Sequence, residues 1–255
     1  SPPHSYDAER AGFLPAIVGS VWLCAIVVVF GVPVGVGAAI YLHEFAPRSR
    51  VTTIIQVNIS NLAGVPSVVY GLIGLSAFVG FFNVFGTESV QYSLLGGLID
   101  LPFGRTVLSG GLTLTLLVLP VIIIASQEAL RAVPDTQREA ARALGATPWQ
   151  TVRTAVFPVA LPGMMTGSIL ALSRAIGETA PILVAGAVGV LFTSPGSLMD
   201  QYTAMPVVIY DWANEPNRDF QSVAASGILV LLVVLLVFNS AAILIRAHAQ
   251  RRLSP

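Results

Sequence analysis

The sequence predicts an all-α protein, a polytopic transmembrane helical bundle, and three observations support this fold class. Of the 255 residues, 55% are hydrophobic and only 10% are charged, whereas soluble domains carry about 25% charged residues. The apolar residues gather in runs long enough to cross a bilayer, and most of the arginines fall in a few short segments between these runs. Together these features indicate several membrane-spanning helices.

Five apolar runs reach the length of about 20 residues that a helix needs to cross the hydrocarbon core. They lie at about residues 14–41, 54–82, 107–125, 163–190 and 223–245. The first run contains two small residues four apart, Gly31 and Gly35. Small residues let neighbouring helices approach closely, so we interpret them as packing positions.

The second run carries polar residues within its apolar sequence. Asn61, Ser67 and Tyr70 interrupt it, and Pro66 removes one helical hydrogen bond. Broken helices at membrane depth are tolerated where the backbone lines a cavity or is buried in protein. Two interpretations follow, a wall of a transport pathway to which these three side chains contribute, and a polar contact between helices.

The distribution of arginine predicts the orientation of the loops. Residues 43–50, residues 131–153 and the segment after residue 245 hold most of the arginines, and five alternating spans place all three segments on one side. Because cytoplasmic loops carry an excess of basic residues, we expect one transmembrane domain over residues 1–255, with a cytoplasmic loop at about 126–162 and an external loop at about 191–221. This orientation places the N-terminus outside, and no signal sequence precedes the first apolar run. We therefore expect a sixth span upstream in the full protein.

The composition argues against several functions. A net charge of zero gives no electrostatic basis for binding nucleic acid. All 13 basic residues are arginine, so the lysine of a P-loop is missing and any ATP must be hydrolysed on another chain. The three histidines match no metal-ligand spacing, and the sequence contains neither His-Glu-x-x-His nor Gly-x-Ser-x-Gly. We therefore expect no catalytic residues, no metal and no cofactor bound by this chain.

The predicted cytoplasmic loop contains two short helices. Asp135 can cap the first, and Gly145 is expected to end it with a positive φ angle. Thr147 can cap the second helix, with Pro148 as its first residue. A helix with a small alanine face and charged flanks, such as Arg138 and Arg142, suits a groove on a partner. The alternative is a helix resting on lipid headgroups.

Here the sequence resembles a known family. "EAARALGA" followed by "FPVALPG" is similar to the EAA loop of ABC importer permeases. The resemblance implies an ABC importer permease fold and a loop that docks on an ATP-binding subunit through Glu139, Ala140, Ala141 and Gly145. "YLHEFAP", "NLAGVPSVVYGLIGL", "ALSRAIGETAPIL" and "AMPVVIYDWA" further resemble PstA-type permeases of phosphate importers.

The resemblance also implies partners and a location. Such a permease would pair with a homologous PstC-type subunit in the bacterial cytoplasmic membrane, surrounded by lipid. A dimer of PstB-type subunits would hold ATP and Mg²⁺, and an external PstS-type protein would deliver phosphate. The alternatives are the PstC-type subunit itself, a permease for another oxyanion such as molybdate or sulfate, and a passive channel, which would need no docking loop.

Two charges stand in a stretch that is otherwise uncharged. Arg174 and Glu178 are four residues apart, and residues four apart share one face of a helix. If Pro162 starts the fourth span, Arg174 lies roughly 18 Å along it, near the middle of a core of about 30 Å. The pair either handles phosphate, which an arginine fork matches bidentately, or locks two helices together. Gly177 and Pro181 would let this helix bend.

The external loop contains three aromatic residues. Tyr202, Tyr210 and Trp212 are candidates for anchors at the membrane interface. They could alternatively contact an external binding protein.

Overall fold

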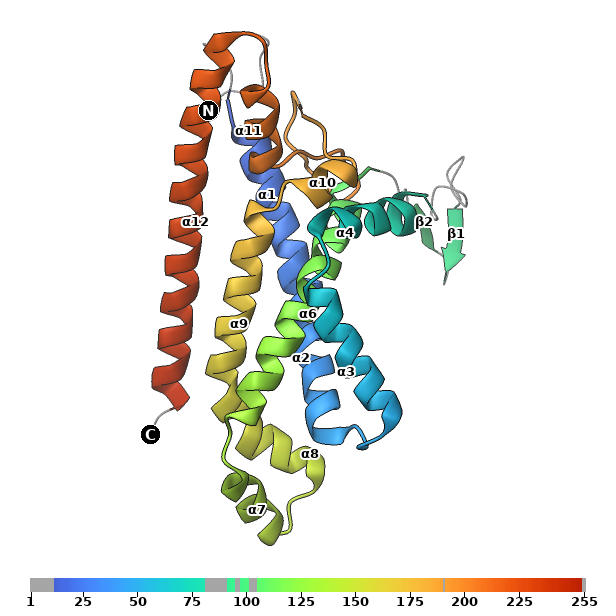
Figure 1. Cartoon of the computed structure of the whole chain (residues 1–255), viewed down its shortest axis with the longest axis vertical. Helices are drawn as coiled ribbons and strands as arrows, with labels where there is room; N and C mark the ends of the chain where they lie inside the picture. The colour runs from blue at the N-terminus through green and yellow to red at the C-terminus, as the bar shows by residue number, and fades with distance from the viewer. Residues whose placement is uncertain (1–11, 81–90, 95–96, 101–104, 190, 254–255) are drawn as a thin grey trace. The chain divides into compact units, whose positions relative to one another are not determined.

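The computed structural model describes residues 12–80, 91–94, 97–100, 105–189 and 191–253 (Figure 1). Most of these residues are helical, with short π-helical turns labelled η. In chain order the elements are α1 Leu14–Ile26, η1 Val27–Gly31, α2 Val32–Ile40, η2 Tyr41–Phe45, α3 Arg50–Ala63, α4 Ser67–Gly74, η3 Leu75–Gly80, β1 Gln91–Leu94, β2 Gly97–Asp100, α6 Val107–Arg131, α7 Asp135–Ala143, α8 Pro148–Thr151, η4 Val152–Val156, α9 Phe157–Gly177, α10 Ala180–Val184, α11 Met205–Ala213 and α12 Arg218–Leu253. The predicted all-α class is confirmed; in the described residues its one sheet is the antiparallel hairpin β1–β2.

Among the described residues, four helices are long and apolar enough to cross a membrane. They occupy Leu14–Phe45, Val107–Arg131, Pro148–Gly177 and Arg218–Leu244. A fifth candidate is a bent pair, Arg50–Ala63 followed by Ser67–Phe78. The helices predicted for the first, third and fifth apolar runs are therefore confirmed, and the second and fourth need correction.

The second run is not one straight helix. α3 ends at Ala63, α4 begins at Ser67, and the two axes differ by 106°. Pro66 lies between them with φ −55° and ψ 137°, which is not helical. Proline lacks an N–H and disfavours helical geometry in the residue before it, so α3 does not continue through this position. Residues 81 and 82 of the predicted span lie outside the described residues.

The fourth run begins earlier and ends earlier than expected. α9 starts at Phe157 and contains Pro162, so this proline does not set the start of the helix. Membrane helices tolerate internal proline because neighbouring groups and local π-helical adjustments satisfy the freed backbone groups, and η4 directly precedes α9. The helix ends at Gly177, and the short helix α10 occupies part of the remaining predicted run.

The chain divides into two compact units, each drawn from three segments. The first unit comprises Ser1–Val28, Val65–Leu117 and Ala175–Leu235, and the second comprises Val29–Gly64, Val118–Arg174 and Leu236–Pro255. Each unit has its own apolar cluster, described below.

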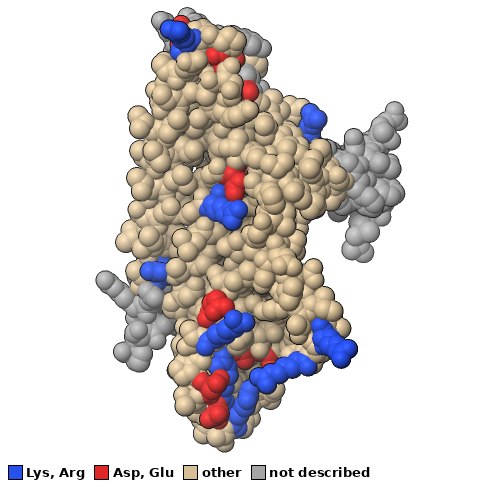
Figure 2. Space-filling view, in the orientation of Figure 1, with Lys and Arg blue, Asp and Glu red and all other residues tan. Residues whose placement is uncertain are grey.

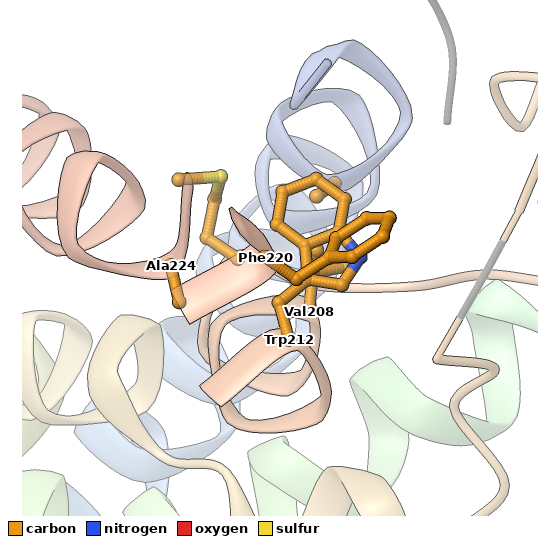
Figure 3. Packing of buried hydrophobic residues seen from close by; sticks show 6 residues of the cluster. Val208, Trp212, Phe220 and Ala224 are labelled. Carbon is orange, nitrogen blue, oxygen red and sulfur yellow. The ribbon is translucent and has the colours of Figure 1, made fainter. Parts of the chain in front are cut away.

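In the first unit the cluster joins α1, α11 and α12 (Figure 3). The ring of Trp212 lies 5.0 Å from that of Phe13 and 6.0 Å from that of Phe220. Trp212 is 3% exposed and Tyr202 is fully buried, whereas Tyr210 is 54% exposed. The interpretation of Tyr202 and Trp212 as interfacial anchors is therefore wrong, because packing within the chain removes both rings from the surface.

The first unit also supplies partners for the start of α6. The first N–H groups of a helix have no acceptor within the helix. Here the N–H groups of Val107 and Leu108 donate to the carbonyls of Asp200 and Leu198, at 3.0 and 2.9 Å. The Asp200 carboxylate accepts hydrogen bonds from the Ser197 hydroxyl and from two backbone N–H groups, which lower the pKa of Asp200.

In the second unit the cluster lies beside the loop that carries α7 and α8. Its buried members are Leu130, Val133, Val156, Ala160 and Met164. Residues of α2 pack against this cluster. A Cβ atom at Gly35 would come within 2.6 Å of the Ile122 side chain, which confirms the predicted packing role of Gly35.

Candidate functional site

The loop between α6 and α9 folds into the two short helices that the sequence predicts. α7 covers Asp135–Ala143 and α8 covers Pro148–Thr151. Pro134, not Asp135, is the N-cap of α7. Asp135 is instead the first helical residue, where its charge complements the positive end of the helix dipole.

Gly145 ends α7 as expected, with φ +83°. The N–H of Ala146 donates to the carbonyl of Ala141 at 3.1 Å, and that of Gly145 donates to Arg142 at 2.9 Å. This pair of bonds is the Schellman motif, in which glycine is favoured because its missing Cβ removes the steric cost of a positive φ. Thr147 and Gln150 then form a capping box at the start of α8, which confirms Thr147 as a cap.

The loop presents an exposed surface in which small and apolar residues mix with charges. Glu139, Ala140 and Gly145 are exposed and Ala141 is half-buried. Beside them Leu144 is 90% exposed and Trp149 is 59% exposed. Figure 2 shows basic and acidic side chains gathered over the region of α7 and α8. An exposed leucine and tryptophan framed by charges suit a protein partner, because aromatic and apolar anchors dominate interface energies.

Arg138 does not lie on the charged outer face where the sequence places it. It is 8% exposed, whereas its neighbours Glu139 and Ala140 are exposed. Its main partner is Glu44, 94 residues earlier in the sequence. No local pattern links these two residues, so sequence reasoning missed the contact.

Arg174 lies in the last turn of α9 and is exposed in this single chain. A cation there is favoured by the negative end of the helix dipole. Glu178 is half-buried and follows the end of the helix, so the two residues do not continue one regular helix as expected. The break at residues 178–179 does lie between Gly177 and Pro181, where the sequence predicts a bend.

The other three predicted pathway residues belong to the bent pair of helices. Asn61 is exposed near the end of α3. Ser67 begins α4 and is half-buried, and Tyr70, one turn later, is 6% exposed. Ser67 and Tyr70 thus stand on one side of the break and Asn61 on the other.

Polar contacts join helices at residues that the sequence did not single out. Gln56 of α3 and Gln127 of α6 exchange amide hydrogen bonds at 2.6 and 3.4 Å. α9 and α12 are joined by Ser173 with Asn239, and by Arg246 with Thr166 at 2.6 Å. The sequence signal for these residues is their polarity within or directly beside apolar runs. Among the residues that the structure describes, no group of three or more His, Cys, Asp or Glu side chains could hold a metal ion.

Comparison with known proteins identifies relatives that cover most of the chain. Residues 31–255 match the family described as "Binding-protein-dependent transport system inner membrane component". The chain is 34% identical over 248 residues to "Phosphate transport system permease protein PstA 1" of Mycobacterium tuberculosis, covering 94% of this chain and 72% of the relative. It is 31% identical over 235 residues to "Phosphate transport system permease protein PstA" of Xylella fastidiosa, covering 91% and 73%.

Solved structures share the fold at lower identity. A chain of the inward-facing MetNI methionine ABC transporter superposes with a TM-score of 0.67 at 18% identity, covering 93% of this chain and 97% of that one. A chain of a bacterial ABC transporter for alginate import gives 0.63 at 14% identity, covering 95% and 80%. The fold is thus that of importer permeases.

Proposed function

Because this chain belongs to the family of binding-protein-dependent transport system inner membrane components and is a permease subunit of an ABC importer, we propose that its substrate is inorganic phosphate and that it is the PstA-type subunit. The observation that carries this proposal is the similarity of more than nine-tenths of the chain to permeases named for phosphate transport. Its expected location is the bacterial cytoplasmic membrane.

Within that function, Arg174 is proposed to handle the anion. A guanidinium keeps its charge in an apolar environment and presents donors that match phosphate oxygens. The carbonyls at the end of α9 carry partial negative charge, which offsets part of the attraction. Transport requires such moderation, since an anion that binds too tightly does not leave. Glu178 would moderate the site further, and Asn61, Ser67 and Tyr70 would supply neutral polar groups.

The loop of α7 and α8 is proposed to dock on the ATP-binding subunit through Glu139, Ala140, Ala141 and Gly145. ATP and Mg²⁺ would be bound and ATP hydrolysed on that partner. A PstC-type permease would complete the pathway, and a PstS-type protein would deliver phosphate from outside. The exposed state of Glu139, Ala140 and Gly145 supports the docking assignment.

ATP-driven uptake of radiolabelled phosphate into proteoliposomes that contain the assembled transporter tests the proposal. Uptake should require ATP and should resist a large excess of unlabelled sulfate or molybdate. Inhibition by either oxyanion would reassign the substrate, and uptake without ATP would indicate a channel. Complementation of strains that lack either the PstA-type or the PstC-type subunit separates those two identities.

A further inference from the structure

Arg138 joins three separate elements at the base of the loop. It lies on α7, one residue before Glu139, and its side chain is 9% exposed. Its Nη2 donates to Glu44 Oε1 at 2.9 Å and to the carbonyl of Leu130 at 2.9 Å. Its Nη1 donates to the carbonyl of Val133 at 2.8 Å and to Asp135 at 3.0 Å. With Nε also directed at Glu44, at 3.3 Å, every nitrogen of the guanidinium has an acceptor.

The three elements have different positions in the chain. Glu44 belongs to η2, at the end of the long helix Leu14–Phe45. Leu130 lies in the last turn of α6, and the Val133 carbonyl lies just beyond that helix. The last carbonyls of a helix lack partners within it and attract a cation. Arg138 therefore satisfies the end of α6 and holds Glu44 with the same planar group.

The side chain of Glu44 is buried and contacts two basic side chains. Its side chain is only 7% exposed, and His43 Nδ1 lies 3.0 Å from the same Oε1 atom that Arg138 contacts. A buried ion pair of this kind is costly to break by removing one partner, because the other charge then remains buried without compensation. The link is thus stiff, in contrast with the exposed pair Arg131–Glu128, whose side chains are 55% and 60% exposed.

We infer that Arg138 is a positioning residue that transmits movement of α7 to the membrane helices that end at Glu44 and Leu130. The inference rests on the proposed docking of α7 to an ATP-binding partner. On α7, Glu139 and Ala140 are exposed to such a partner, whereas Arg138 is buried. A push on the exposed face would reach Leu14–Phe45 and α6 through one guanidinium, without a flexible loop between them.

Arg138→Lys tests the inference in the complex with its ATP-binding partner. Lysine keeps the charge but has three donors on a flexible stem and lacks the planar fork. We expect the variant to retain the ATPase on copurification and to hydrolyse ATP, while the phosphate imported per ATP falls about fivefold, within the range that substitutions in coupling networks produce. Arg131→Lys, at the exposed ion pair in the last turn of α6, is the control and should leave that ratio unchanged.

A distance measurement gives a readout that does not depend on phosphate. Spin labels at Arg48, in the short segment that follows η2, and at Thr136 of α7, both exposed, report the separation of that segment from α7 in a Cys24→Ala background. In the otherwise unaltered complex this distance should stay the same between nucleotide-free and vanadate-trapped states, and Arg138→Lys should make it state-dependent. If the complex carried no phosphate but this behaviour held, only the substrate assignment would fail.

Three results would overturn the inference. One is an unchanged ratio of phosphate to ATP in Arg138→Lys. Another is loss of ATPase binding in that variant, which would place Arg138 in docking itself. The third is a distance that already varies between states in the unaltered complex. If Arg138→Lys does not reach the membrane, Glu44→Gln, which keeps the side-chain size and one acceptor oxygen, is subject to the same measurements and decides the question.

Discussion

The N–H of Ala146 bonds to the carbonyl of Ala141 at 3.1 Å, and this closure of α7 requires Gly145 between them to adopt φ +83°. An L-residue in place of glycine at position 145 would be strained, by about 1–3 kcal/mol. The turn holds the exposed Leu144 at the tip of the loop. The geometry of the proposed docking surface therefore depends on one glycine.

Gly145→Asp should leave the protein in the membrane but abolish ATP-driven phosphate uptake. The substitution strains the turn and places a negative charge at the negative end of the α7 dipole. Uptake is measured together with pull-down of the ATP-binding subunit. Gly37→Ala is the matched control, because Gly37 is helical and a Cβ there meets no atom within 4 Å. Normal uptake with normal ATPase binding in Gly145→Asp would remove the docking assignment.

Arg174→Gln should abolish phosphate uptake while assembly with the partner subunits survives. Glutamine keeps hydrogen-bonding groups but lacks the charge that a dianion needs in an environment of low dielectric constant. The measurements are uptake in proteoliposomes and copurification of the complex. If Arg174 served only to lock helices, its loss would leave the half-buried Glu178 carboxylate without a compensating charge, and assembly would fail.

The double variant Arg174→Gln, Glu178→Gln separates these roles because it removes both charges. A structural role predicts that assembly and uptake both return. A role in handling the anion predicts assembly without uptake. Restored phosphate uptake would sink the proposal for Arg174.

Asn239→Ala should weaken the packing of α12 against α9, because it removes the contact between Asn239 and Ser173. Only 6% of the apolar window of Arg218–Leu244 is buried, so this helix has few packing contacts within the chain. Ser173 with Asn239 and Thr166 with Arg246 pair in antiparallel register, seven residues apart on both helices. Hydrogen bonds between membrane helices contribute about 0.6 kcal/mol on average and up to about 1.7.

We therefore expect Asn239→Ala to lower the free energy of unfolding in detergent by about 0.6 to 1.7 kcal/mol. Asn58→Ala is the control, because the Asn58 amide is exposed and donates to the carbonyl of Ile54 within its own helix. Equal effects of the two variants would contradict a specific role for the contact between α9 and α12.

Trp212→Ala should destabilise the first unit severely. Its indole packs between Phe13 and Phe220 in a buried cluster, and truncating a buried tryptophan costs about 3–5 kcal/mol. Tyr210→Ala, two residues away on the same helix but 54% exposed, should change stability by less than about 0.5 kcal/mol. Thermal unfolding of the purified protein compares them. Similar melting temperatures would restore the interpretation of Trp212 as a surface anchor.

Much of the architecture could be predicted from local sequence. Apolar length identified the helices within Leu14–Phe45, Val107–Arg131 and Arg218–Leu244, because a membrane span is defined by the bilayer thickness and not by distant contacts. Gly145 and Thr147 were correctly assigned for a similar reason. Helix caps are local hydrogen-bond motifs, so the residues that form them lie within a few positions of one another.

The tertiary structure decided what local patterns leave open. Pro66 indicated a break in the second run but not its 106° angle, and Pro162 was mistaken for a helix start because packing and π-helical turns can accommodate an internal proline. From the sequence, Trp212 was interpreted as an aromatic residue at the surface, but in the structure residues of α1 and α12 cover it. From the sequence, Arg138 was interpreted as a surface charge, but in the structure it forms an ion pair with Glu44, which is far away in the sequence. Burial and charge pairing depend on which distant segments meet, and that information is carried by the whole chain and not by any short stretch of it.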